Sequence, residues 1–295
     1  MEAHAKTKSL ELLNSSTSLY SLPDVYFRLR SVLDNPDYSM AEVVSVISTD
    51  VGLTARLLKL VNSAFYGFKS KIYSVPNAIG MIGTQQLQDM VLATSVTRTF
   101  AGISSDLMDM DDFWYNSIYC GVAARLLASR CDFFDCERLF IAGLLCDIGH
   151  LVMYQELPEL SQQSIRKSRE SDAALHDVEQ EIFGFDYAQA GGVLTRQWKL
   201  PRILQHAIRY QLNPTGSEDY FLAAAIVHIS RELTTAVEAD AGTEPQDLKI
   251  SPEIWELIGL SPSACDSLCE EVKAQVGEIS NLIFPGNRNS RVNAR

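Results

Sequence analysis

The residues best suited to chemistry lie in one short run, where Cys146 and Asp147 are followed by His150. A thiolate, a carboxylate and a neutral imidazole can all bind a metal, and an imidazole can also act as a general base. Asp147 and His150 are three residues apart, so on a helix they share one face. This spacing suits a pair of metal ligands or a histidine packed beside a carboxylate, and we expect the second. The apolar neighbours of Cys146 predict a raised thiol pKa and an unreactive side chain.

The remaining histidines and cysteines indicate no second chemical centre. His206 and His228 lie in apolar helical segments, where we expect one hydrogen bond to satisfy each ring. Cys131 and Cys136 have no histidine nearby and lack the spacing of a zinc knuckle. Residues 80–85 contain two glycines but lack the lysine and the preceding strand of a phosphate-binding loop, so we interpret them as a helix-to-helix turn.

The composition is that of an acidic globular chain, with 295 residues of which 46% are hydrophobic and 21% charged. Its formal net charge of −12 provides no broad positive surface for a phosphate backbone, so we expect no nucleic-acid partner. No stretch approaches the ~20 apolar residues that a membrane span requires, and we expect no membrane partner. The six cysteines and the lack of a visible export signal predict reduced thiols and a cytoplasmic location.

Helix signals recur along the whole chain and predict an all-α fold. Ser39 and Glu42 have the spacing of a capping box, and Ser251-Pro252 places a proline where a helix begins. Alternation of apolar and polar residues, which is typical of strands, is scarce.

The helical period breaks at residues 101–112, where an acidic cluster favours the start of a new helix. We therefore predict two helical lobes, residues 1–110 and residues 111–284. Residues 285–295 are polar and basic, and we expect them to form a flexible tail.

The turn at residues 62–67 carries a second group of candidate functional residues. Asn62 and Ser63 can bond their own backbone and end a helix, and Gly67 can adopt the positive φ of a helix stop. Phe65 and Tyr66 add two aromatic side chains to the same turn. One interpretation is a lobe-packing element, in which truncating a buried Phe65 to alanine would cost ~3–5 kcal/mol. The other is a recognition turn for a partner or a ligand.

Two segments of the chain have the form of family signatures. Residues 53–67 read LTARLLKLVNSAFYG and residues 143–151 read GLLCDIGHL. The first closely resembles the signature helix and turn of the HD-related output domain (HDOD) family. The second is similar to the HD-superfamily core motif, which ordinarily reads His-Asp-Ile-Gly. The likeness continues, in the family's order, through 22–23, 113–114, 186–188, 198–201 and 227–228.

The HDOD resemblance implies a second lobe built as an HD-like helical bundle, and a bacterial protein that works in signalling. HD enzymes hold a divalent metal that activates water for attack on phosphorus. The positions of the metal ligands, and of two further histidines common in relatives, are occupied here by Asn116, Cys146, Arg231, Tyr187 and Tyr210. Only Asp147 is kept, and a single carboxylate with a cation in place of the last aspartate is a poor metal site. The resemblance therefore implies no metal, no cofactor and no enzyme activity.

These departures from the HD pattern lead us to expect a non-catalytic regulatory or signal-transduction module. It would bind a protein partner through the degenerate HD-type cleft. Whether a small ligand also binds in this cleft is a question that the sequence leaves open. The alternative is a metal-dependent phosphohydrolase acting on a nucleotide or a cyclic dinucleotide. A third hypothesis is a ligand sensor without a protein output. The lost ligands separate the first two hypotheses, whereas the sequence does not separate partner binding from ligand sensing.

Arg231 is predicted to occupy the place of the absent metal and to pair with Asp147. A buried carboxylate without a cation nearby is costly and tends to protonate. Arginine stays charged and can meet a carboxylate with two parallel hydrogen bonds. The same charge would repel a divalent ion. The alternative is an Arg231 that reaches solvent or a surface acid.

Overall fold

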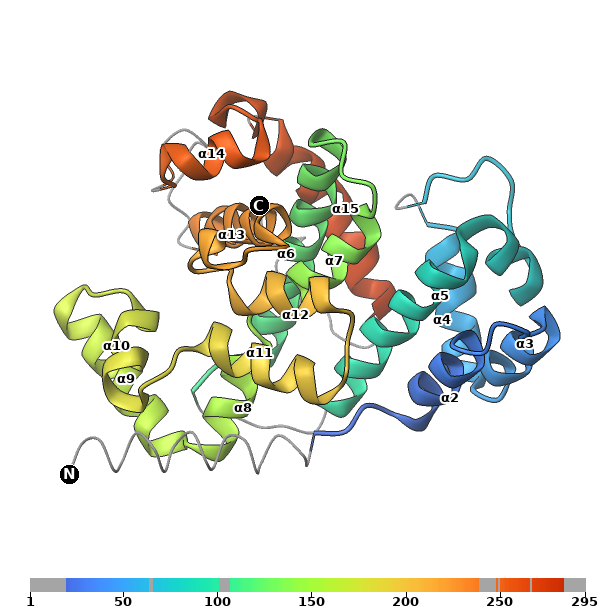
Figure 1. Ribbon diagram of the computed structural model, residues 1–295, viewed down its shortest axis with the longest axis horizontal. Helices are drawn as coiled ribbons and strands as arrows, with labels where there is room; N and C mark the ends of the chain where they lie inside the picture. Colours follow the sequence, from blue (N-terminus) through green and yellow to red (C-terminus); the bar gives the residue numbers. More distant parts are fainter. Residues whose placement is uncertain are drawn as a thin grey trace. The chain divides into compact units, whose positions relative to one another are not determined.

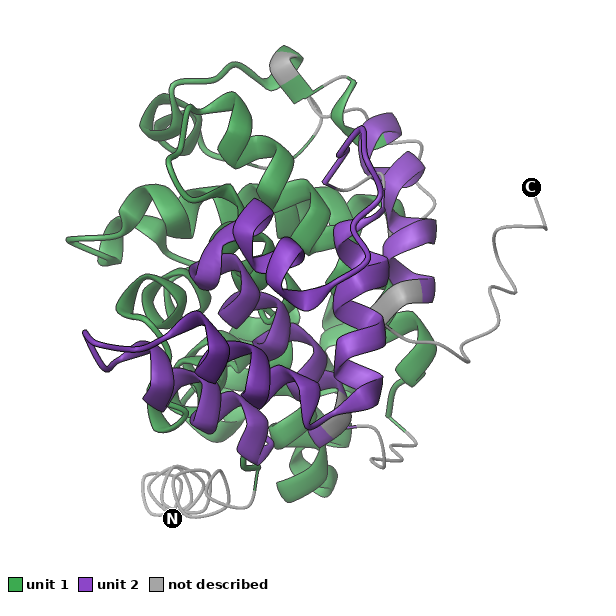
Figure 2. Ribbon diagram, turned by 90° about the vertical axis from the view of Figure 1, so that its right-hand side faces the viewer, with its two compact units in different colours: residues 1–21, 103–269 green, residues 22–102, 270–295 purple. Residues whose placement is uncertain are grey.

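The structure of this chain, a computed structural model, describes residues 20–63, 66–100, 107–238, 248, 250–265 and 267–283. These residues form helices and connecting loops and contain no strand, which confirms the predicted all-α class. The chain separates into two compact units (Figure 2). Unit 1 consists of Met1–Ser21 and Ile103–Cys269, and unit 2 consists of Leu22–Gly102 and Glu270–Arg295.

Unit 2 is organised around the long helix α5, which contacts α2, α3 and α4. Its helices are α2 (Asp24–Leu33), α3 (Met40–Ser48), α4 (Val51–Val61), α5 (Val75–Thr99) and, from Glu270 onward, α15 (Leu268–Ile283) (Figure 1). The predicted capping box is present, because Glu42 N–H donates to Ser39 Oγ over 3.3 Å and Ser39 N–H donates to Glu42 Oε2 over 2.7 Å. These bonds satisfy backbone donors that would otherwise be orphaned at the start of α3.

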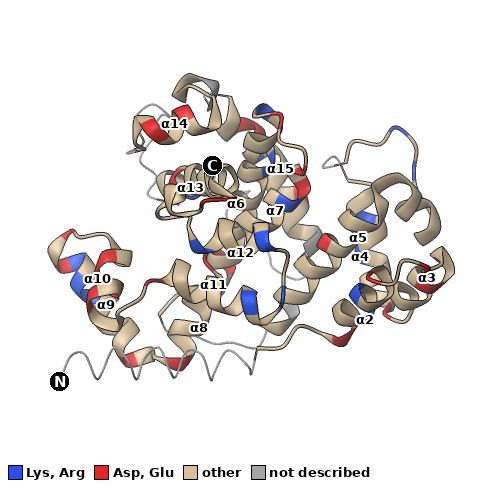
Figure 3. Cartoon of the chain, in the orientation of Figure 1, with Lys and Arg blue, Asp and Glu red and all other residues tan. Residues whose placement is uncertain are grey.

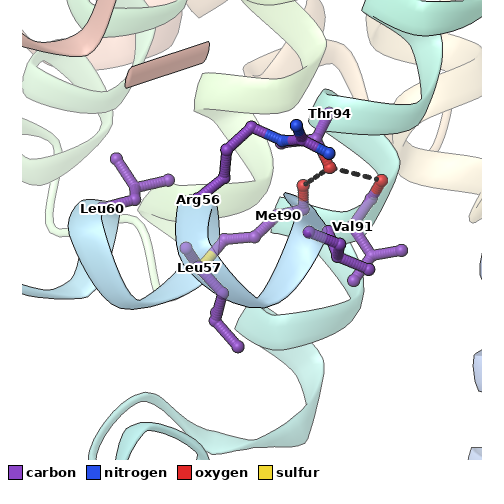
Figure 4. A pocket seen from close by; sticks show the side chains of 7 residues that line it. Arg56, Leu57, Leu60, Met90, Val91 and Thr94 are labelled. Carbon is purple, nitrogen blue, oxygen red and sulfur yellow. Dashed lines mark hydrogen bonds between the residues drawn. The ribbon is translucent and has the colours of Figure 1, made fainter. Parts of the chain in front are cut away.

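Helices α4 and α5 pack through apolar residues that lie at helical spacing in the sequence. The apolar residues at helical spacing, Leu53, Leu57 and Leu60, are buried on one face of α4. With Met90 and Val91 of α5 they line a cavity of about 10 Å³, too small for anything larger than one water molecule (Figure 4). It is therefore a packing gap and not a ligand site.

Helix α5 bends in the region predicted to be a turn between helices. Gly83 has φ 84° and ψ 166°, which lies outside helical space. A positive φ of this kind suits glycine, which has no Cβ to clash with the backbone. The helix-to-helix turn predicted for residues 80–85 is thus confirmed at Gly83.

Unit 1 is organised around α6, which contacts both α7 and α13. Its helices are α6 (Met110–Arg130), α7 (Cys136–Leu144), α8 (Ile148–Glu156), α9 (Pro158–Ser171), α10 (Leu175–Phe183), α11 (Tyr187–Gln197), α12 (Arg202–Arg209), α13 (Phe221–Glu238) and α14 (Pro252–Ile258), with the short 3₁₀ helices η2 (Pro214–Gly216) and η4 (Pro262–Cys265). The acidic cluster before α6 acts as predicted. Asp109 caps the helix by accepting from Asp111 N–H over 2.8 Å and from Asp112 N–H over 3.2 Å.

Glycines allow the helices of unit 1 to approach closely. A Cβ on Gly143 of α7 would lie 2.6 Å from the carbonyl oxygen of Cys120 on α6. A Cβ on Gly149 of α8 would lie 1.9 Å from the carbonyl oxygen of Tyr187 on α11. Neither position has room for a larger residue, so the spacing of α6 from α7 and of α8 from α11 depends on glycine.

The two units divide the chain differently from the predicted lobes at 1–110 and 111–284. Unit 2 consists of two separate segments of the chain. The first ends at Gly102, and the second begins at Glu270 and includes most of α15. Helix α15 buries Val272, Val276 and Ile279, which lie at helical spacing on one face. The predicted tail at 285–295 lies outside the described residues. No helix in the described part of the chain combines the length and the apolar character needed to cross a membrane.

Candidate functional site

The centre of the candidate site is an ion pair between Asp147 and Arg231. Asp147 stands directly before α8 and its side chain does not cap that helix. Arg231 comes from α13, and its Nε atom lies 3.0 Å from Asp147 Oδ1 and 2.9 Å from Oδ2. The two side chains are only 12% and 20% exposed, so the pair is screened less by water than a surface ion pair. The predicted pairing of Arg231 with Asp147 is confirmed.

The form of this pair is not the two parallel hydrogen bonds that arginine can make with a carboxylate. A single donor, Nε, serves both carboxylate oxygens, and Nη1 contacts the hydroxyl of Thr235. Thr235 lies one turn after Arg231 on α13, so it is placed to hold the guanidinium in this orientation. The cation is thereby fixed over Asp147 by its own helix.

Cys146, which stands where the HD motif ordinarily has its histidine, is a buried thiol. Its Sγ lies 3.5 Å from Sγ of Cys120 on α6. Burial first, then the contact with Cys120 and the negative charge of Asp147, raise the pKa of the Cys146 thiol well above its usual value. The predicted inert thiol is consistent with this environment, since a nucleophile or a metal ligand would have to be a thiolate.

The structure brings some of the other predicted positions close to this pair. Tyr187 is the first residue of α11 and is buried, and the pKa of its phenol is raised by burial and then by the charge of Asp147. Asn116 is half-buried on α6, one turn before Cys120 and thus on the face that meets Cys146. Tyr210 ends α12, where its ring packs against His206 with centroids 5.4 Å apart.

A buried histidine–glutamate pair beside Asp147 is the main feature that sequence reasoning missed. His150 Nε2 lies 3.1 Å from Oε1 of Glu179, a residue of α10 that is fully buried. The other oxygen of Glu179 accepts the backbone N–H of Tyr187 over 3.0 Å. A carboxylate at the start of α11 is favoured by the positive end of that helix. The expected histidine packed beside a carboxylate is present, although the carboxylate is that of Glu179.

Two tyrosines enclose the His150 ring. The ring stacks on Tyr187 with centroids 4.2 Å apart and on Tyr154 with centroids 5.2 Å apart. Burial first and the charge of Glu179 second raise the pKa of the Tyr154 phenol above its usual value. Both phenols therefore stay protonated, and the cluster ties α8, α10 and α11 together.

Gln211 was also absent from the predicted site, although it connects several of its parts. Its side-chain Nε2 donates to the backbone carbonyl of Cys146 over 2.7 Å, and its backbone carbonyl oxygen lies 2.7 Å from Nδ1 of His228. Burial lowers the pKa of His228, so its ring is neutral at pH 7 and donates Nδ1–H. The prediction of one hydrogen bond for His228 is confirmed. His206 is likewise satisfied, with Nδ1 3.0 Å from Ser217 Oγ.

The residues of this site do not fit the divalent metal that the HD pattern implies. In the described part of the chain, no group of three or more His, Cys, Asp and Glu side chains lies close enough to hold a metal ion. The kept carboxylate is already paired with a guanidinium, and the neighbouring thiol is held in its neutral form. His150 is committed to Glu179 and stacked between two rings. This donor set is a poor match for a divalent metal, which prefers several carboxylate or neutral imidazole ligands.

The family-motif turn at residues 62–67 is held by the side chain of Asn62. Its Nδ2 donates to the carbonyl of Leu58 and to that of Ile72, both over 2.7 Å, and its Oδ1 accepts Ile72 N–H over 2.7 Å. Ser63 is buried and donates to Leu60 O over 2.6 Å. Gly67 has φ 62°, as predicted for a helix stop. Asn62 thus clamps the end of α4 to the segment that leads into α5.

The aromatic residues of the turn are only partly described. Tyr66 is half-buried and stacks on Phe68 with centroids 5.9 Å apart and an interplanar angle of 12°. Phe65 lies outside the described residues, so the predicted burial of its ring and the cost of truncating it stay predictions.

Comparisons with known proteins agree with this architecture. A crystal structure of a phosphohydrolase candidate from Shewanella amazonensis SB2B superposes with a TM-score of 0.72 at 24% identity, covering 92% of this chain and 98% of that one. An HDOD domain protein of unknown function from Geobacter sulfurreducens gives 0.70 at 21% identity, covering 92% and 99%. A candidate signal transduction protein from Marinobacter aquaeolei VT8 gives 0.69 at 22% identity, covering 96% of this chain and 66% of that one. At these identities the likeness shows the fold alone.

The sequence comparisons identify the family. An uncharacterised protein of Treponema pallidum (strain Nichols) is 26% identical over 200 residues, which are 68% of this chain but only 39% of that relative's length. The model of the HDOD domain matches residues 19–214, which is more than half of the chain. The chain therefore belongs to the HDOD domain family.

Proposed function

We propose that this chain is a non-catalytic signal-transduction module of a bacterial cytoplasm, which regulates by binding a protein partner through its degenerate HD-type site. The observation that carries the proposal is the position of Arg231. Its guanidinium lies on Asp147, the one metal-binding position that the chain keeps. The protein thus uses a side chain where an HD enzyme uses a metal.

Electrostatics favour this proposal over metal-dependent hydrolysis. Two unit charges ~4 Å apart interact by ~4 kcal/mol at an effective dielectric constant of ~20, so a divalent ion beside Arg231 would face roughly twice that repulsion. The neutral thiol of Cys146 and the amide of Asn116 offer little to offset it.

The names of similar structures point in two directions. The Shewanella amazonensis protein is named as a phosphohydrolase candidate and the Marinobacter aquaeolei protein as a candidate for signal transduction. We favour signal transduction for this chain because of the Asp147–Arg231 pair.

A metal-binding experiment tests the non-catalytic part of the proposal. Protein purified without a chelator and offered manganese, iron, nickel or zinc should carry no stoichiometric metal by elemental analysis. The Asn116→His/Cys146→His variant should also stay free of metal, because Arg231 still repels the ion. Adding Arg231→Asp should allow binding, since it supplies the missing carboxylate and removes the cation.

Two results of the same experiment would contradict the proposal. One is near one metal per wild-type chain, lost in Asp147→Ala and accompanied by hydrolysis of a phosphodiester such as bis(p-nitrophenyl) phosphate. The other is tight metal binding by the double variant with Arg231 in place, which would refute the repulsion argument.

Partner binding through this site is tested by affinity purification on the immobilised chain. Thr235 is exposed and contacts Arg231, so a Thr235→Glu variant changes the charge at the site with little effect on the core. A bacterial protein retained by the wild type and lost on Thr235→Glu supports the proposal. Retention that does not depend on position 235 would place the partner surface elsewhere.

A further inference from the structure

A basic and apolar groove in unit 2 is separate from the degenerate HD site. It lies where the α4–α5 loop meets the start of α5 and has a volume of about 500 Å³. Its lining includes Phe68, Lys69, Lys71, Pro76, Gly80 and Met81. Volumes of ~300–1,000 Å³ are typical of small-ligand sites, so the groove has room for a few atoms of a partner's side chain.

A large exposed apolar side chain, that of Met81, lines the groove beside its lysines, and a second, that of Tyr73, is exposed on the adjoining loop. Met81 is 55% exposed, and Tyr73, next to the groove-lining Ile72, is 79% exposed. Both are residue types that are enriched in the buried centres of protein interfaces. Lys69 and Lys71 are exposed on the same loop.

The charge around the groove is opposite to that of the chain as a whole. Residues 51–88 contain two arginine or lysine residues on α4, Arg56 and Lys59, and two on the loop, but no aspartate or glutamate, whereas the whole chain has a net charge of −12. Figure 3 shows the loop between α4 and α5 marked in blue and without red. A positive surface on an acidic protein attracts acidic partners and fixes their orientation.

The groove is also built to be rigid. Two hydrogen bonds of Asn62 fix Ile72 and a third ties Asn62 to Leu58 O, and Ser74 Oγ accepts Asn77 N–H over 3.3 Å at the start of α5. A preformed surface loses less conformational entropy when a partner binds.

We propose that this groove binds an acidic peptide segment of a partner protein, with an apolar side chain seated against Met81 and carboxylates facing Lys69 and Lys71. Two lysines are too few for a phosphate backbone, where proteins commonly make ~6–10 contacts, or for an anionic membrane, which commonly needs ~4–8 clustered basic residues. The proposal goes beyond the function proposed above, since it concerns another unit and does not depend on the Asp147–Arg231 pair.

Gly80 provides a sharp way to block the groove. Gly80 is exposed on α5, and a Cβ added there would meet no atom within 4 Å. Gly80→Leu should therefore fill the groove while leaving the helix intact or slightly more stable, because glycine is a poor helix former. Lys71→Glu reverses one charge of the groove. Lys59→Glu is the matched control, an exposed lysine of the same acid-free stretch that does not line the groove.

The test is a selection of a random peptide library displayed on phage against the full chain. Enriched peptides should carry acidic residues around an aromatic or aliphatic side chain. Synthetic copies should bind Gly80→Leu and Lys71→Glu roughly tenfold or more weakly than the wild type, and Lys59→Glu about as well as the wild type. Binding should shift the methyl NMR signal of Met81 and not that of Met40, which is also exposed in unit 2.

Several outcomes would overturn the proposal. They are the failure to enrich any peptide, enrichment without an acidic bias, and binding that Gly80→Leu leaves unchanged. Phosphatidylserine vesicles or a single-stranded oligonucleotide that bound in a Lys71-dependent manner, without competition from the peptides, would assign the groove to a membrane or to nucleic acid instead. A negative result here leaves the metal and Thr235 experiments unaffected, so the two proposals fail independently.

Discussion

At the scale of single residues, the Asp147 carboxylate is paired with the guanidinium of Arg231. The side chains of the pair are 12% and 20% exposed, so water compensates only partly if the guanidinium is removed. Arg231→Met should therefore lower the free energy of unfolding by about 3 kcal/mol, the lower end of the range for breaking a buried pair. Urea unfolding measures the loss.

A double variant separates the contribution of the ion pair to stability from the contribution of side-chain packing. Asp147→Asn/Arg231→Met removes both charges, so we expect it to lose only about 1 kcal/mol, because no buried charge is left unpaired. Equal losses in the single and double variants would mean that the arginine contributes through packing alone.

His228 predicts how stability responds to acid. Burial lowers the pKa of its ring in the folded chain, so the unfolded chain binds more protons below about pH 6.5, the ordinary histidine pKa. Stability from this residue is therefore present above that pH and is lost as the pH falls. The urea midpoint of the wild type should drop between pH 7.5 and pH 5.5.

His228→Asn is the control for this pH dependence. Its amide can still donate toward Gln211 O, but it does not titrate. The variant should lose less of its urea midpoint over the same pH range. If its pH dependence matched that of the wild type, the titrating group would lie elsewhere, with His206 next to be tested because burial also lowers its pKa.

At the scale of helices, the glycine of the core motif sets the distance between α8 and α11. A Cβ at position 149 would lie 1.9 Å from Tyr187 O, an overlap that only a backbone shift can relieve. That shift would also disturb Glu179, which accepts Tyr187 N–H, and its partner His150. Gly149→Ala should therefore destabilise the chain by about 3 kcal/mol or prevent folding.

Gly277→Ala is the matched control for Gly149→Ala. Gly277 lies within α15, and a Cβ there would meet no atom within 4 Å. The change should be neutral or stabilising by up to about 1 kcal/mol, because alanine loses less backbone entropy in a helix. Thermal unfolding of the two variants distinguishes steric overlap from helix propensity, since propensity alone would stabilise both.

The elements that the sequence predicted well are those with local signals. The capping box at Ser39, the helix start in the acidic cluster at residues 106–112 and the turn at Gly83 each depend on residues within about one helical turn. The Asp147–Arg231 pair, 84 residues apart, was predicted only through the family pattern. No local pattern could show that Glu179 contacts His150. The burial of Glu179 was open to prediction, because it lies four residues before the apolar Phe183 and therefore on the same face of α10.

At the scale of the whole molecule, the chain is not divided at a single point. The lobes predicted from sequence assume contiguous segments, because a break in apolar period marks where a segment ends but not where a later helix returns. In the structure, the chain from Glu270 onward belongs with residues 22–102. The degenerate site and the basic groove consequently lie in different units.

This division predicts the effect of shortening the chain after Cys269. Removing α15 from Glu270 onward deletes the buried Val272, Val276 and Ile279, so unit 2 should lose much of its core. Amide hydrogen exchange should speed up mainly in α2–α5, while α6–α13 keep most of their protection. Removal of residues 285–295 alone, the segment predicted to be a flexible tail, is the control and should change little. If exchange instead rose mainly in α6–α14, the helix would stabilise residues 111–284, as the contiguous division requires.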